Sequence, residues 1–220
     1  MAEINLLFLC DVDFRVTYFA VNKPASGDTH AHFLCQHGMR MHSRLFFVTA
    51  GNTHFLCKNE KGEKRQVDAG AGDIVYLPDD VAYESWWDDP AVIDFVSLEF
   101  ALEDERGQRL VCGDTLDVVA HDRNNLFLSA FTRILDTWLR GELGYRIRCR
   151  AQFLDVLHML IVENARQMYH SEGGEVSKGI LYLENHYLEE TPIADLARLC
   201  GMCESNFRSR FQKNIGMPPV

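Results

Sequence analysis

The sequence lacks long apolar runs, a regular set of cysteines and an overall excess of positive charge. The apolar stretch INLLFLC near the N-terminus is interrupted by Asn5 and closed by Asp11, so it is too short for the core of a signal peptide. No stretch reaches the roughly 18–20 apolar residues of a membrane span, which predicts no membrane partner. The seven cysteines are odd in number and scattered, which favours reduced thiols and a cytoplasmic location.

The charge balance limits the classes of nucleic-acid-binding protein that the chain can belong to. The 220 residues carry a formal net charge of −10. A protein that binds nucleic acid over its whole surface depends on an excess of Lys and Arg, so this balance excludes that class. Any contact with nucleic acid must be confined to a local patch. The length allows one large or two small domains, and a hydrophobic content of 47% is enough for a packed core.

Two halves of the chain have different hydrophobic periods. From about Leu45 to Phe100, short apolar and aromatic runs alternate with turns such as TAGN, KNEKGEK and DDPA, a spacing that predicts an antiparallel barrel or sandwich. After EDERGQR, which ends at Arg109, the apolar residues recur at three- and four-residue steps within 124–140 and 148–169, which predicts two amphipathic helices. The glycine-rich stretch 170–177 is the best candidate for a linker.

The stretch TPIADLARLCGMCESNFRSRF, residues 191–211, predicts two short helices joined at a glycine corner. Thr191 can cap the first helix, and Gly201 can adopt the left-handed conformation that ends it. A second helix begins near Glu204, and the four-residue spacing of Phe207 and Phe211 predicts that both rings face inward. This pattern is typical of a helix-turn-helix.

Charge supports a groove-facing role for the second helix. Residues 204–220 contain three cations and one anion, a local +2, which leaves a formal −12 for the rest of the chain. A redox or zinc role for the nearby Cys200 and Cys203 is less favoured. No strand precedes the pair and no second pair of ligands follows it at a suitable spacing, so a structural role is the preferred interpretation.

Residues 179–219 resemble the first helix-turn-helix of AraC-type transcription regulators. The shared features are the spacing of Ile180, Tyr182, Leu183 and Tyr187 in a lead helix, LA before GM, the two phenylalanines four residues apart, and GMPP after them. Residues 72–100, which include GDIVYLPDDVAYESWW, resemble the cupin-like sensor domain of the same family. The resemblance implies an α+β protein: an N-terminal antiparallel cupin-like β-barrel over 1–120, a helical linker and dimerisation pair over 121–172, and a partial DNA-binding domain over 177–220.

The resemblance also implies roles for individual residues. Ser205, Arg208 and Ser209 would approach base edges in the DNA major groove, and Arg210 and Lys213 would meet phosphates. Two features depart from the family: Cys203 takes the place of the usual capping serine, and Ser209 replaces a typical arginine. The chain also stops at Val220, before the second helix-turn-helix of the family, so we expect Val220 to be a truncation and expect weak DNA binding.

Five histidines within 30–54 raise the question of a metal site. In the metal-binding motifs of cupin enzymes, the usual glutamate position is occupied here by Arg44 and a usual histidine position by Tyr83. We therefore expect no metal and no cofactor. Arg44, Tyr83 and Trp86 are instead candidates to bind a small molecule, while the alternative is that the aromatic residues only fill the core.

These observations predict a ligand-responsive, sequence-specific regulator of transcription and not an enzyme. Its expected partners are operator DNA, a small-molecule effector, a second copy of the chain in a homodimer and, by the resemblance, RNA polymerase. One alternative is a metal-free sensor or co-regulator whose helix-turn-helix contacts protein. Another, from a different class, is a cupin enzyme, which would bind a metal and turn over a substrate.

Overall fold

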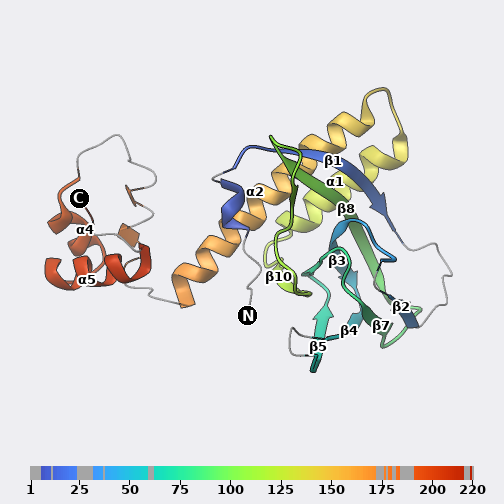
Figure 1. Cartoon of the computed structure of the whole chain (residues 1–220), viewed down its shortest axis with the longest axis horizontal. Coiled ribbons are helices and arrows are strands. Elements are labelled where there is room, and N and C mark those ends of the chain that lie inside the picture. Colours follow the sequence, from blue (N-terminus) through green and yellow to red (C-terminus); the bar gives the residue numbers. More distant parts are fainter. Residues whose placement is uncertain are drawn as a thin grey trace. The chain divides into compact units, whose positions relative to one another are not determined.

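The computed structural model of the chain is drawn in Figure 1. It describes residues 6–10, 12–23, 32–36, 38–58, 62–171, 176, 178–179, 182–183, 191–215 and 219, with the side chains of Leu7, 166–171 and 213–215 left out. Within these residues no helix is long and apolar enough to cross a membrane.

Along the chain, the described strands come first and the described α-helices follow them. A short 3-10 helix, η1, covers Leu7–Cys10. The strands are β1 (Phe14–Asn22), β2 (His32–Cys35), β3 (Ser43–Ala50), β4 (Asn52–Lys58), β5 (Lys64–Gly70), β6 (Asp73–Leu77), β7 (Tyr83–Trp87), β8 (Asp94–Asp104), β9 (Arg109–Leu110) and β10 (Asp117–His121). The helices are α1 (Leu126–Arg140), α2 (Tyr145–Ser171), α4 (Ile193–Leu199) and α5 (Glu204–Ile215). The predicted mixture of strands and helices is confirmed.

The strands form two antiparallel sheets. The larger has the order β1-β8-β3-β6-β10, with β9 paired to β8, and the smaller has the order β2-β7-β4-β5. Among the described residues no ladder joins the two sheets, so the expected closed barrel is corrected to an arrangement of two separate sheets. The chain passes between the two sheets at tight turns: at Gly51, where φ is 75°, it leaves β3 of the larger sheet and enters β4 of the smaller sheet.

Alternation along β3 explains why the larger sheet is covered on both faces. Phe46 and Val48 belong to a core shared with the smaller sheet, which includes Phe55 and Tyr83. Leu45 and Phe47 point the other way, because successive side chains of a strand lie on opposite faces. They join a second core, to which α1 and α2 contribute side chains such as Phe131.

The two predicted amphipathic helices are confirmed as α1 and α2. The buried residues of α1 are Phe127, Ala130, Phe131 and Ile134. Those of α2 include Phe153, Val156, Leu157 and Leu160. Most of the apolar residues of this helical pair, to which the resemblance assigned dimerisation, are therefore buried in the chain's own core. Burial of one such side chain stabilises the fold by roughly 1.5–3 kcal/mol.

The chain divides into two compact units, Met1–Val162 and Glu163–Val220. The first unit contains both sheets together with α1 and most of α2, whereas the sequence separated a sensor at 1–120 from a helical region at 121–172. The proposed linker at 170–177 lies largely outside the described residues.

In the second unit, α4 and α5 are joined by residues 200–203. Gly201 has a φ of 68°, the left-handed conformation expected at this corner. Helix α4 begins one residue later than expected: Pro192 is its N-cap, with extended backbone and no side-chain cap. Phe207 and Phe211 are buried with ring centroids 5.6 Å apart, which confirms their inward direction.

Candidate functional site

Of the residues expected to bind a small molecule, Arg44 lies on β3 at the edge of the space between the sheets. It is two residues before Phe46 and so points toward the same shared core. Its Nη2 donates to Oε2 of Glu99 on β8 at 2.8 Å, and β3 and β8 pair Arg44 directly opposite Glu99. Its Nε is buried and has no hydrogen-bond partner in the described part of the chain. Arg44 therefore keeps one unused donor at a partly buried position.

A small polar cluster surrounds this arginine. Nδ1 of His42 lies 3.3 Å from Oε1 of Glu99. The His42 ring stacks on the ring of Tyr18, with 3.8 Å between the ring centroids. Burial, followed by the neighbouring charge of Arg40, lowers the pKa of the Arg44 guanidinium, while Glu99 opposes this shift. A second cation close to a partly buried arginine creates a local positive potential.

Tyr83 lies on β7 and contributes to the same end of the space between the sheets. The guanidinium carbon of Arg40 lies 5.3 Å from the ring centroids of both Tyr83 and Phe33. Burial raises the pKa of the Tyr83 hydroxyl. Arg44 and Tyr83 are close enough for each side chain to influence the pKa of the other. Cations and aromatic rings in this combination can hold an anionic or hydroxylated molecule.

A cavity lies next to Tyr83, but it does not gather all the expected residues. Its volume is about 500 Å³, and its wall includes Tyr83, Cys57 and Lys64. Arg44 and Trp86 are not in the wall. Tyr83 and Trp86 are three residues apart on one strand, so they point to opposite faces of the sheet. The structure thus brings Tyr83 near Arg44 and places Trp86 elsewhere.

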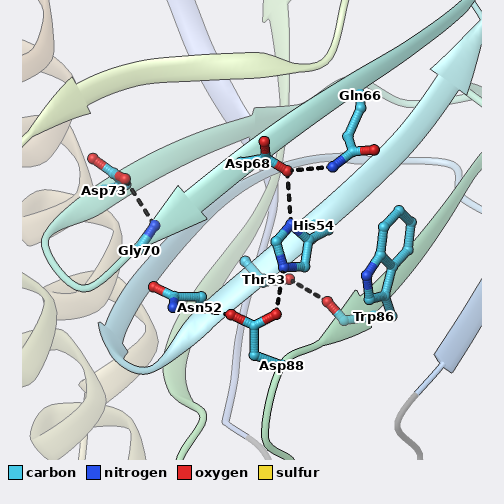
Figure 2. A network of polar contacts seen from close by, with 9 residues as sticks. All are labelled: Asn52, Thr53, His54, Gln66, Asp68, Gly70, Asp73, Trp86 and Asp88. Atoms are coloured by element: carbon cyan, nitrogen blue, oxygen red, sulfur yellow. Dashed lines mark hydrogen bonds and ion pairs between the residues drawn. The ribbon is translucent and has the colours of Figure 1, made fainter.

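Trp86 belongs to a polar network on the outer face of the smaller sheet, which Figure 2 shows. His54 on β4 lies at its centre: Nδ1 is 2.7 Å from Oδ1 of Asp68, and Nε2 is 2.8 Å from Oδ1 of Asp88. Trp86 stacks on the His54 ring at 5.2 Å. Since each ring nitrogen faces a carboxylate, both nitrogens donate when the imidazole is protonated.

Sequence reasoning did not single out this network, although a signal existed. The turn KNEKGEK predicted a hairpin, and continuing its pairing back along both strands sets His54 opposite Asp68. The contribution of Asp88 depends on the β4–β7 pairing, which no local pattern gives. Among the described residues, no group of three or more His, Cys, Asp or Glu side chains is arranged to hold a metal ion.

We expect His54 to make stability depend on pH. Its hydrogen bond with Asp68, and secondarily that with Asp88, raises the pKa of His54 above the usual 6.5. A raised pKa in the folded state stabilises the protein fully below the unfolded-state pKa, and this contribution is lost as pH rises through the folded-state pKa. His54→Gln should therefore lower the Tm by about 2–4 °C on the acidic side of neutrality and by less in alkaline buffer.

Thermal unfolding of both proteins across this pH range measures the effect. His158→Gln is the matched control, because His158 is exposed on α2. A difference in Tm that stays constant with pH, or one that grows in alkaline buffer, would contradict the assignment.

The residues expected to contact DNA all belong to α5, where Arg208 and Arg210 flank the face that carries Ser205 and Ser209. Ser205, Arg208, Ser209 and Arg210 are exposed, and the side chain of Lys213 lies outside the described part. Arg208 forms an ion pair with Glu204 one turn earlier, with Nη2 2.9 Å from Oε1. Sequence reasoning did not foresee that pair. Because about half of each side chain is exposed, the pair is weak and can open when a better acceptor approaches.

Cys203 forms the N-cap of α5, where the sequence placed a weak cap. Its carbonyl accepts the backbone N–H of Phe207 at 3.0 Å, and its Sγ lies 3.4 Å from Oγ of Ser205. The hydrogen bond with Ser205, followed by the backbone N–H of Asn206, lowers the pKa of the Cys203 thiol. Cys200 has the opposite environment, since burial raises the pKa of its thiol. The thiolate is the reactive form, so the two cysteines should differ in reactivity.

We expect iodoacetamide to modify Cys203 roughly tenfold faster than Cys200 or Cys149 near neutral pH, because thiolate character and exposure both favour it. Mass spectrometry of peptides from a time course measures the three rates within one sample. Equal rates at Cys203 and Cys149 would contradict the described environments.

Comparisons with known proteins give only distant likenesses. No family model matches the chain, and no curated protein matches it. Among solved structures, an apo ToxT variant from Vibrio cholerae is 12% identical, with 92% of this chain and 96% of that chain covered and a TM-score of 0.40. The 7S globulin of Momordica charantia is 14% identical, with 39% and 26% covered and a TM-score of 0.29. Oxalate decarboxylase from Bacillus subtilis is 13% identical, with 41% and 27% covered and a TM-score of 0.26.

The match spans about a quarter of the length of the globulin and of the decarboxylase. ToxT is an AraC-family regulator, whereas oxalate decarboxylase is a cupin enzyme. The expectation that the chain is not an enzyme is contradicted by the presence of several oxalate decarboxylases among these neighbours, and it is not kept. At these identities and TM-scores, none of the likenesses assigns an activity to this chain.

Proposed function

We propose that the chain is a ligand-responsive, sequence-specific DNA-binding regulator of transcription. The observation that carries the proposal is the exposed polar face of α5 opposite the buried Phe207 and Phe211, in the part of an acidic chain where cations outnumber anions. A helix with this distribution suits insertion into a major groove, with its apolar side held by a neighbouring helix.

In this proposal the residues of α5 have separate roles. Ser205, Arg208 and Ser209 read base edges, while Arg210 and Lys213 bind phosphates. Operator DNA is one partner and RNA polymerase another. The DNA-binding part corresponds to 177–220, the sensor to 1–120, and the helical connection to 121–172.

The effector is proposed to bind at the end of the space between the sheets, against Arg44 and Tyr83. The unused Nε of Arg44 supports this placement, because a buried donor without an acceptor is costly and a ligand oxygen would satisfy it. The neighbouring Arg40 favours a molecule that carries negative charge or several hydroxyl groups. Trp86 is left out of this site because it lies on the outer face.

Selection from a random pool of DNA duplexes tests the proposal. The expected result is enrichment of a common sequence by the wild-type chain, and loss of that enrichment with Ser205→Ala/Arg208→Ala. Ser129→Ala on α1 is the control that should enrich the same sequence. Retention of DNA without any common sequence would contradict sequence-specific reading. No retention at low salt would favour the alternative of a sensor module that contacts protein.

We also propose that the chain forms a homodimer through an exposed apolar stripe on α2. Ile147, Ala151 and Leu154 are exposed at four- and three-residue steps, and Ile147 keeps 76% of its surface accessible. Ile147→Asp should convert dimers to monomers, because a charge in the centre of an apolar interface has no partner. Light scattering at matched concentrations measures the mass. Val92→Asp, at an exposed apolar residue between β7 and β8, should leave the mass unchanged, and a monomeric wild type would contradict the proposal.

A further inference from the structure

The first unit contains a groove between α1 and α2 that the proposed function does not use. Its volume is about 620 Å³, within the range of small-molecule sites. Residues from both helices and from the connecting loop at 141–144 line it. The groove therefore lies between two consecutive elements of one compact unit.

The groove carries an excess of arginine. Its wall includes Arg133, Arg140 and Arg148, against Asp136 and Glu142. Arg140 pairs with Asp136 at 3.5 Å. Arg133 and Arg148 have no carboxylate within ion-pair distance among the described residues. Two guanidinium groups without a described carboxylate partner give this groove a local positive potential, although the chain as a whole has a net charge of −10.

The base of the groove contains a polar group that lacks a partner. Gln152 on α2 lines the groove and is 7% exposed. Its Oε1 is buried and accepts no hydrogen bond from the described part of the chain. A buried acceptor without a donor destabilises the free protein, so a leucine at this position would make the free protein more stable. Gln152 lies one helical turn after Arg148, and both therefore face the same groove.

We propose that this groove binds a small oxyanion that also carries a hydroxyl group. The guanidinium groups of Arg133 and Arg148 bind the anionic group, because a planar guanidinium matches carboxylate and phosphate oxygens. The hydroxyl donates to Oε1 of Gln152. The site lies on α1 and α2, separate from the effector site proposed at Arg44, and its existence does not depend on DNA binding.

Calorimetric titration of the full chain tests this inference with defined probes. Glycerol 3-phosphate carries a phosphate with hydroxyl groups, glycerate carries a carboxylate with hydroxyl groups, and glycerol lacks the anion. We expect at least one of the two anionic probes to bind and glycerol to show no heat of binding. Failure of both anionic probes to bind, or equal binding of glycerol, would overturn the proposal.

Variants distinguish binding of the probe in the groove from nonspecific binding of the probe to exposed arginines. Arg148→Gln should weaken binding of the probe at least tenfold, while Arg150→Gln, an exposed arginine of the same helix outside the groove wall, should leave it unchanged. Gln152→Leu should abolish binding without lowering the Tm of the free protein. Equal effects of the two arginine variants, or unchanged binding in Gln152→Leu, would overturn the assignment.

Light scattering with and without the probe shows whether the groove is occupied by a small molecule or by a second copy of the chain. If Arg148→Gln changes the mass of the assembly and no probe binds, the groove is an interface between copies and the small-molecule site is wrong.

Discussion

Replacing Arg208 with alanine should weaken binding to the selected operator by roughly 1–3 kcal/mol, about 5- to 150-fold, and should weaken binding to random DNA far less. The arginine has the exposed position and the length to make a bidentate contact with guanine. It reaches DNA by giving up its pair with Glu204 and the 3.5 Å contact of its Nη1 with the carbonyl of Pro219. A weak, half-exposed pair opposes that exchange only slightly. Fluorescence anisotropy with both duplexes at fixed salt measures the two affinities.

Two variants on the same helix make this result specific. Glu204→Gln removes the competing carboxylate and leaves Arg208 in place, so operator affinity should be equal or higher. Lys213→Ala should weaken binding to both duplexes by similar factors and reduce the salt dependence, since a phosphate contact carries no sequence information. Equal losses of operator affinity and random-DNA affinity in Arg208→Ala would refute its role in reading bases.

Replacing Phe207 with alanine should unfold the helices α4 and α5 while leaving the first unit folded. Phe207 is fully buried in a core whose described buried members are Val176, Leu196, Ala197, Phe207 and Phe211. Truncation of a buried phenylalanine costs roughly 3–5 kcal/mol, which is a large part of the stability that so small a core can supply. The ring also lies against Gly179, where an added Cβ would approach Cε2 to 2.7 Å, so the surrounding residues are fitted to this side chain.

Calorimetry of the full chain should detect the loss as a missing or lowered transition, with the transition of the first unit unchanged. Asn206→Ala, an exposed neighbour on α5, is the control and should leave both transitions in place. A loss below about 1 kcal/mol would contradict the described burial of Phe207. A shift in the other transition would contradict the division into two units.

Local sequence patterns were sufficient to predict the features that depend on a single secondary-structure element. The helices α1 and α2, the left-handed Gly201 and the inward rings of Phe207 and Phe211 follow from periodicity and backbone sterics over a few residues. The strands β1 and β2 were not predicted, because the sequence before residue 44 does not show apolar runs regularly separated by turns. The closed barrel was wrong because closure depends on pairing between distant strands.

The chemistry of the candidate sites depended on contacts that no local pattern contains. Arg44 could be named from its position in a motif, but its partner Glu99 is 55 residues away and adjacent only through the pairing of β3 with β8. Alternation along β7 places Tyr83 and Trp86 on opposite faces, but the register of β7 decides which of the two faces inward, because one residue of shift exchanges the faces. The free acceptor of Gln152 arises where α2 packs against α1.

The sequence by itself determined the acidic balance, the change from strands to helices, the glycine corner and the cation-rich face of α5, since each depends on residues within a few positions of one another. Tertiary structure decided that most of the apolar stripe of α1 and α2 packs on the larger sheet. It also decided which exposed residues remain for an interface and which charged groups meet. The physical reason is that strand pairing and helix packing bring together residues far apart in the chain, and the free energy of those contacts depends on which residues become neighbours.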